Sequence, residues 1–133
     1  MMKTGATMAG RRPLCIVIRI PSTTLSRDEL EAALRGRLSR YEPSGDGTSA
    51  YAQIDIADEP DAWAAALDCL QSAGDALRRL NADGRIKSPV LDIAVPFPSS
   101  LAATSLKVPA ALAAVAGQAG ISIEISIYCT CDN

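Results

Sequence analysis

The chain has 133 residues, of which 48% are hydrophobic and 21% charged, and its formal net charge is −2. This length and composition are typical of one globular domain with a single hydrophobic core. Aromatic residues make up only 4% of the sequence and the basic residues are scattered, so the base stacking and phosphate contacts of a nucleic-acid-binding protein are not expected.

The N-terminal segment and the first predicted strand differ in pattern. Residues 1–12 lack hydrophobic periodicity, and we expect a flexible extension there, followed by a single α/β domain over residues 13–133. Residues 13–21, PLCIVIRIP, alternate as a β-strand does, and both faces are largely apolar until Arg19. This pattern predicts an interior strand.

Residues 26–40 are predicted to form the first helix. Ser26 and Glu29 have the spacing of a capping box, in which a hydroxyl and a carboxylate satisfy amides that the helix leaves unpaired. Arginines crowd the expected ends of this helix and of the next, where the helix dipole favours cations; an anion site is the alternative if the two ends converge. These arginines are Arg35, Arg37, Arg40, Arg78, Arg79 and Arg85.

A turn-rich loop over residues 41–49 precedes the second predicted strand, residues 50–58. Polar residues alternate with apolar ones in this strand, so one of its faces is expected to be wet. The polar face carries Tyr51, Gln53 and Asp55.

The longest predicted helix covers residues 59–84. Pro60 suits its first position, and Asp58 or Glu59 can cap it. Gly74 interrupts the apolar stripe of this helix and predicts a close approach to the sheet.

The C-terminal third contains two predicted strands around a short, alanine-rich helix. The third strand covers residues 88–99, and its Pro96 indicates that the end of the strand is a sheet edge or has left the sheet, because proline has no amide to donate. The helix covers residues 105–120 and the fourth strand residues 121–133. The buried face of that strand is predicted to carry Ile121, Ile123, Ile125, Ile127, Cys129 and Cys131, and its polar face Ser122, Glu124, Ser126, Tyr128 and Thr130.

Taken in order, these elements read β-α-β-α-β-α-β. They predict a two-layer α/β (α+β) sandwich in which three helices cover one face of a four-stranded sheet. The polar residues of the second and fourth strands leave the other face to water or to a partner, which argues against a parallel sheet covered on both sides.

The residue types place limits on the chemistry. The sequence contains no histidine, the commonest general base and a member of the usual serine and cysteine triads. Neither of the glycine-rich patterns that cradle phosphates is present. We therefore predict a non-enzymatic protein with no catalytic residue, no cofactor and no metal site.

The four cysteines, Cys15, Cys69, Cys129 and Cys131, lie on apolar faces and are interpreted as reduced structural thiols. A disulfide, or a soft-metal site built on Cys129 and Cys131, is the alternative. No apolar run approaches the roughly 20 residues of a membrane-spanning helix. No signal peptide is evident, so we expect a cytoplasmic protein without membrane contact.

An acidic run joins the end of the second strand to the start of the longest helix: Asp55, Asp58, Glu59 and Asp61. One interpretation is a solvated strand end followed by a capped helix, since negative charge opposes the positive helix end. A second is a patch that docks on a basic partner. A third is a Mg²⁺ site, because hard cations bind carboxylate oxygens.

Two stretches carry a family resemblance: "CIVIRIPSTTLSRDELEAAL", and the closing pattern "ALRRLNADG…LDIAVPFPSS…SLKVPAALAAVAGQAGISIEISIY". They resemble an uncharacterised bacterial family of small α/β proteins over most of the chain from Leu14 to Tyr128. Similar proteins include ones that resemble immunity proteins of bacterial toxin–immunity systems, such as contact-dependent growth inhibition and polymorphic toxins. The resemblance implies a binding protein and supplies no catalytic motif.

We therefore expect a non-catalytic immunity protein that neutralises a cognate bacterial toxin by direct binding, with an acidic and polar surface that occludes a basic active site. The expected contacts are Tyr51, Asp55, Asp58, Glu59, Asp61, Glu124 and Tyr128. One alternative is a small-molecule-sensing or regulatory α/β module, which a thermal-shift screen would reveal. Another is a metal-dependent enzyme built on the acidic run, which Mg²⁺ or Mn²⁺ would affect.

Overall fold

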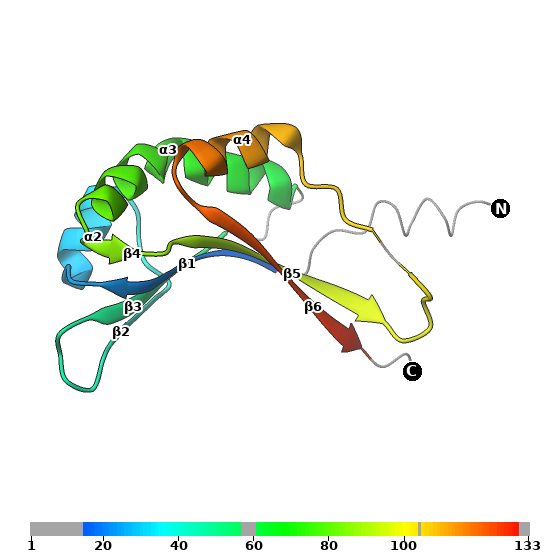
Figure 1. The fold of residues 1–133 in the computed structure, drawn as a ribbon, viewed down its shortest axis with the longest axis horizontal. Helices are drawn as coiled ribbons and strands as arrows, with labels where there is room; N and C mark the ends of the chain where they lie inside the picture. The colour runs from blue at the N-terminus through cyan, green and yellow to red at the C-terminus, as the bar shows by residue number, and fades with distance from the viewer. Residues whose placement is uncertain (1–14, 57–60, 104, 131–133) are drawn as a thin grey trace.

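The computed structural model describes residues 15–56, 61–103 and 105–130, in which three helices lie on one side of a six-stranded sheet (Figure 1). In chain order the elements are β1 (Cys15–Thr23), α2 (Arg27–Leu34), β2 (Arg40–Pro43), β3 (Ala50–Asp55), α3 (Ala62–Ala82), β4 (Ile86–Lys87), β5 (Val90–Pro98), α4 (Ala110–Gln118) and β6 (Ser122–Thr130). The α+β class is confirmed. The four-stranded sheet and the strict strand–helix alternation are wrong, because β2 and β4 were not predicted. The proposed N-terminal extension lies outside the described residues.

The first helix is shorter than its sequence predicts. It ends at Leu34, because Arg35 adopts a left-handed conformation with φ of 57° and Gly36 turns its amide back to the carbonyl of Glu31, at 3.2 Å. The chain then enters β2, which forms an antiparallel hairpin with β3. The prediction that arginines occupy the last turn of this helix is therefore wrong, and Arg40 belongs to a strand instead.

The helix caps follow local chemistry. The capping box of Ser26 and Glu29 is confirmed, with the Ser26 amide donating to Glu29 Oε1 at 2.9 Å. That hydrogen bond, together with the Ser26 hydroxyl, lowers the pKa of the Glu29 carboxyl. The cap of α3 is Asp61, whose Oδ1 accepts the Ala64 amide at 3.1 Å. The expectation of a cap at Asp58 or Glu59 was thus wrong by a few residues.

The sheet is mixed, with the order β2-β3-β1-β5-β6. β1 is interior, as predicted, and runs antiparallel to β3 and β5, whereas β5 and β6 are parallel. β1 continues past Pro21 to Thr23 through a register shift, and there it pairs with the short β4. The pairing of β5 with β1 ends at Ala94, so the Pro96 end of β5 has β6 as its one described neighbour. Pro96 itself stays in the sheet as the register partner of Tyr128. The residues that would continue β1 beside it lie outside the described residues, so its edge character stays a prediction.

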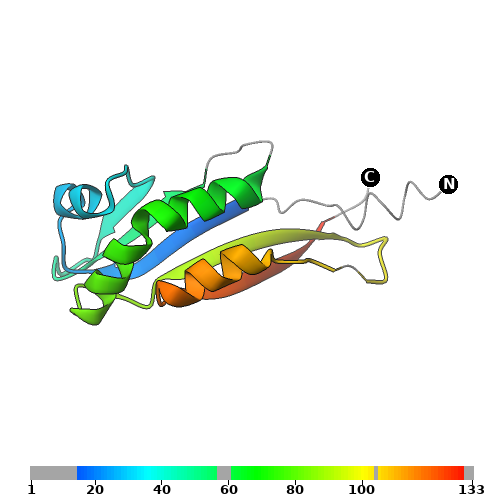
Figure 2. The ribbon, with the colours of Figure 1, turned by 90° about the horizontal axis from the view of Figure 1, so that it is seen from above.

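The hydrophobic core lies between the sheet and the helices. Figure 2 shows α3 running along the sheet and α4 above β5 and β6. Fully buried side chains from both layers meet there, including Ile18, Ile20, Leu70, Leu77, Leu91, Ile93 and Leu112. Gly74 faces the end of α4 and not the sheet, which corrects the predicted close approach: a Cβ at this position would lie 3.5 Å from Ala119 Cβ, an ordinary van der Waals contact. None of the described helices combines the length and apolarity needed to cross a membrane.

The isoleucine face of β6 is only partly buried, which corrects the sequence prediction. Ile121, just before the strand, is 5% exposed, but Ile125 is 42% exposed and Ile127 is 65% exposed. Figure 1 shows the reason: β6 runs out from beneath α4, so the helix layer does not reach its C-terminal half. Cys129, on the same face, is exposed as well. Cys131 lies outside the described residues.

Candidate protein-binding face

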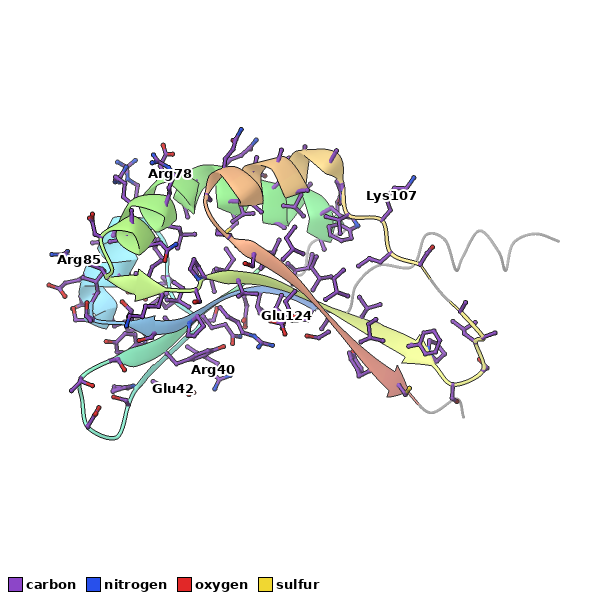
Figure 3. The ribbon with its side chains drawn as sticks, in the orientation of Figure 1. Arg40, Glu42, Arg78, Arg85, Lys107 and Glu124 are labelled. Carbon is purple, nitrogen blue, oxygen red and sulfur yellow. The ribbon has the colours of Figure 1, made fainter. Side chains whose placement is uncertain are left out.

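The side of the sheet that faces away from the helices forms a continuous surface across five strands, which we call the open face. Strand register brings together alternate residues from each strand. They include Arg40 and Glu42 of β2, Tyr51, Gln53 and Asp55 of β3, Val17 and Arg19 of β1, Asp92 of β5, and Glu124, Ser126 and Tyr128 of β6. Figure 3 shows Arg40 and Glu42 on this side and Arg78 among the helices.

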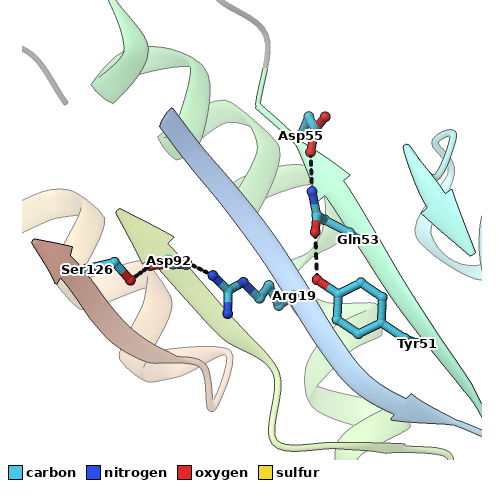
Figure 4. A network of polar contacts seen from close by, with 6 residues as sticks. All are labelled: Arg19, Tyr51, Gln53, Asp55, Asp92 and Ser126. Atoms are coloured by element: carbon cyan, nitrogen blue, oxygen red, sulfur yellow. Dashed lines mark hydrogen bonds and ion pairs between the residues drawn. The ribbon is translucent and has the colours of Figure 1, made fainter. Parts of the chain in front are cut away.

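A buried carboxylate organises the centre of the open face. Asp92 is only 3% exposed, although no described helix covers it. Arg19 reaches across from β1 to donate to Asp92 Oδ2, and the Ser126 hydroxyl donates to Asp92 Oδ1 at 2.8 Å (Figure 4). Because a buried charge is tolerated only when it is paired and hydrogen-bonded, these contacts tie β1, β5 and β6 together on this side.

A second polar row follows β3. The Tyr51 hydroxyl donates to Gln53 Oε1 at 2.6 Å, and Gln53 Nε2 donates to Asp55 Oδ1 at 2.6 Å (Figure 4). On the neighbouring strand, Arg40 lies 5.3 Å from the centre of the Tyr51 ring and donates to Glu42 at 2.6 Å. The Glu42 carboxylate raises the pKa of Arg40. Tyr51 is therefore held in one orientation from both sides.

The charge of the open face is predominantly negative. Among the described residues, Arg19 pairs with Asp92 and Arg40 with Glu42, whereas Asp55 and Glu124 have no ion pair. Glu124 is the register partner of Asp92 on the parallel strand, so the two carboxylates lie side by side and Arg19 neutralises the buried one. The exposed charges without an ion pair among the described residues of this face are thus carboxylates, which favour a basic partner.

Tyr128 differs from the other polar groups of this face. Its ring is half-buried, and its hydroxyl is fully buried without a hydrogen-bond partner among the described residues. An unsatisfied buried hydroxyl is uncommon in native proteins and costs stability. By contrast, the half-buried Tyr41 donates its hydroxyl to the Leu25 carbonyl at 2.7 Å.

This contrast predicts opposite results for the same substitution at two tyrosines. We expect Tyr128→Phe to leave the free energy of unfolding unchanged or to raise it, because no bond is lost. We expect Tyr41→Phe to lower it by about 1 kcal/mol, through loss of the bond to Leu25. Urea denaturation of both variants measures the difference. If Tyr128→Phe lowered the free energy of unfolding by more than Tyr41→Phe does, the Tyr128 hydroxyl would have a hydrogen-bond partner.

The predicted contact residues are divided by the fold. Tyr51, Asp55, Glu124 and Tyr128 lie on the open face. Asp61 caps α3, in the helix layer. Asp58 and Glu59 lie outside the described residues. The acidic run is therefore not one described cluster: Asp55 contacts Gln53, while Asp61 serves the helix, as the capping interpretation expects.

The alternatives of a metal site, a cysteine pair and an arginine-lined anion site find no matching cluster of side chains in the described part of the chain. No group of three or more Cys, Asp or Glu side chains there is arranged to hold a metal ion. Cys69 is half-buried in the helix layer and burial raises the pKa of its thiol, whereas Cys15 and Cys129 are exposed on different strands. Arg78 pairs with Asp75 of its own helix at 3.6 Å.

Two open grooves lie away from the open face. One, with a volume of about 340 Å³, runs between α3 and α4 beside Gly74. The other, about 350 Å³, lies between the start of α2 and the β2–β3 hairpin. In the hairpin turn, the Ser44 hydroxyl and the Thr48 amide lower the pKa of Asp46 to about 2. Both volumes are at the small end of the range for ligand pockets.

Sequence reasoning missed Arg19 and Asp92 as a pair, although a signal was present. Each is a charged residue inside an otherwise apolar strand, and opposite charges in two such strands indicate a cross-strand contact. Ser126 and Gln53 carried no comparable signal, because isolated polar residues on a wet strand face are ordinary. No protein-family model, no curated protein sequence and no solved structure matches this chain, and the inference of function rests on the open face itself.

Proposed function

We propose that this chain is a non-catalytic protein-binding protein that docks a partner on its open face, and specifically an immunity protein that neutralises a bacterial toxin. The observation that carries the proposal is the ordered polar surface on the side of the sheet away from the described helices. Its side chains are fixed by one another, in the networks around Asp92 and Gln53. A surface of this kind is preorganised: its side chains already hold their positions in the free protein.

Preorganisation lowers the cost of binding. Ordering a flexible side chain at an interface costs about 0.5–1.5 kcal/mol, and Tyr51, Gln53 and Arg40 are already held in place. Tyr51 is the natural anchor, because tyrosine and arginine are enriched at binding hot spots and this ring lies against an arginine. The proposed interface therefore centres on β2 and β3 and extends across β1 to Glu124.

The charge of the open face selects the class of partner. The carboxylates of Asp55 and Glu124 are exposed and lack an ion pair among the described residues, so they are available to lysines and arginines of a toxin. A toxin that acts on nucleic acid presents basic residues at its active site. Covering that site with a carboxylate-rich sheet would block substrate and speed capture through electrostatic attraction.

The test uses the product of the neighbouring reading frame, if it carries a toxin-like domain. We expect Tyr51→Ala and Asp55→Lys each to weaken binding by about 10- to 100-fold, because the first removes an anchor and the second reverses a charge. Isothermal titration calorimetry measures the affinity, and growth of cells that express the toxin measures protection. Asp75→Lys, a charge reversal at an exposed site on α3, is the matched control and should leave both unchanged.

Two outcomes would contradict this proposal. The absence of both binding and protection with the neighbouring toxin would remove the immunity function. Binding that is weakened by Asp75→Lys but not by the open-face substitutions would place the interface on the helix layer. Circular dichroism of each variant separates loss of binding from loss of folding.

A further inference from the structure

The two edges of the sheet are built differently. β2, at one edge, is four residues long, and it carries Arg40, Glu42 and Pro43, the charges and proline that discourage further strand pairing. β6, at the other edge, is nine residues long and unbroken in register, and Glu124 is its one charged residue. The described part of the chain leaves its outer side unpaired. An unprotected edge of this kind is a template for another strand.

The backbone of β6 presents its free groups at regular positions. The Ser122 amide donates inward to the Pro89 carbonyl at 3.3 Å. Because amide and carbonyl directions alternate along a strand, Ile123, Ile125, Ile127 and Cys129 direct theirs outward. Two of these residues, Ile125 and Ile127, are also the exposed large hydrophobic residues of the described chain. Free hydrogen-bonding groups and exposed apolar side chains therefore coincide on one edge.

We propose that β6 pairs with β6 of a second copy of this chain, antiparallel, about a twofold axis at Ser126. This residue is the midpoint of Ser122–Thr130, so the register centred on it uses the whole strand. It places Ile125 opposite Ile127 of the second copy, with the outward groups of both residues facing each other. It also places Glu124 opposite Tyr128 and keeps the two Glu124 carboxylates apart. A register centred on Glu124 would set like charges against each other.

The same arrangement accounts for the uncovered half of β6. Each strand's C-terminal half, which runs out from beneath its own α4 (Figure 1), would lie beside the N-terminal half of the other copy's strand and near that copy's α4. α4 suits such a contact, because Ala110–Gln118 contains no charged residue and Ala113 and Ala114 are exposed. The two isoleucines of each copy would then form one buried apolar stripe. A second copy of this chain fits this edge because a twofold interface must be self-complementary. Ile125 and Ile127 lie on either side of Ser126, so a twofold axis at Ser126 pairs each of them with the other.

The first measurement is the mass of the purified protein by light scattering after size exclusion, from low to high micromolar concentration. We expect a shift from 13.9 kDa towards twice that mass. Ile127→Pro removes only an outward amide, so it should spare the monomer and weaken the dimer by at least about tenfold, because two symmetric hydrogen bonds are lost. Ile127→Lys, which leaves the backbone intact, should also weaken it. A monomer at every concentration would overturn the proposal.

Disulfide cross-linking tests the register, in a background with serine at all four cysteines. Ser126→Cys should form a covalent dimer on mild oxidation, because directly opposite residues of a non-hydrogen-bonded pair have Cα atoms about 4.5 Å apart, within disulfide range. Glu124→Cys, on the same face two residues away, is the control and should stay monomeric in reducing-agent-free gels. Equal cross-linking of both variants, or a dimer that survives both Ile127 substitutions, would place the interface elsewhere. Neither result depends on the toxin, so the proposed function is tested separately.

Discussion

Leu77→Ala is expected to lower the free energy of unfolding by about 2–5 kcal/mol, the range found when a fully buried leucine is truncated and a cavity remains. Leu77 is 0% exposed and lies in the C-terminal half of α3, in the core between the helices and the sheet. This loss is a large fraction of the stability of a domain of this size. Chemical denaturation followed by circular dichroism measures it.

The control is Leu67→Ala, on the same helix but only half-buried. The same atoms are removed there with less loss of buried surface, so we expect a smaller effect. If both substitutions cost the same, α3 would not pack with Leu77 innermost. The assignment of the open face would then be wrong, because the position of α3 decides which side of the sheet is covered.

Arg19→Met is expected to lower the free energy of unfolding by about 2–3 kcal/mol, because it leaves the Asp92 carboxylate buried without its cation. The full cost of a broken buried pair is not expected, since the Arg19 side chain is 40% exposed and its partner 3%. The matched control is Arg78→Met, which breaks an exposed pair with Asp75 and should change stability by less than about 0.5 kcal/mol.

A double-mutant cycle makes this prediction sharper. Asp92→Asn alone should destabilise the protein, because Arg19 loses a charged partner. In the Arg19→Met background the same substitution should stabilise it, because it removes an uncompensated buried charge while an amide oxygen can still accept the Ser126 hydroxyl. Additive effects with no change of sign would mean that the two side chains do not interact.

Features that depend on neighbouring residues were predictable from the sequence. The capping box of Ser26 and Glu29 requires residues three apart, and the apolar residues on both faces of β1 up to Arg19 predicted an interior strand. The wet faces of β3 and β6 followed from the alternation of polar and apolar residues. β2 was missed because its strand character comes from pairing with β3, and the short segment Arg40–Pro43 has no apolar alternation of its own.

The candidate site was predictable in part. Tyr51, Asp55, Glu124 and Tyr128 were assigned to one wet face, and the register confirms that they share it. Asp61 was grouped with Asp55 because they are close in the sequence, but one belongs to the helix layer and the other to the open face. Closeness along the chain does not decide which side of a sheet a residue faces once the chain leaves the strand.

The amino-acid sequence by itself determined which side chains of each strand point the same way and where the first helix begins, because periodicity and capping are properties of adjacent residues. The tertiary structure alone decided the strand order, the contact between Arg19 and Asp92, and the point at which the helix layer ends along β6. The first two depend on segments that lie tens of residues apart, and the third on the direction in which β6 runs out from beneath α4. Ile121 and Ile127 occupy the same face of one strand pattern, yet only the first is buried.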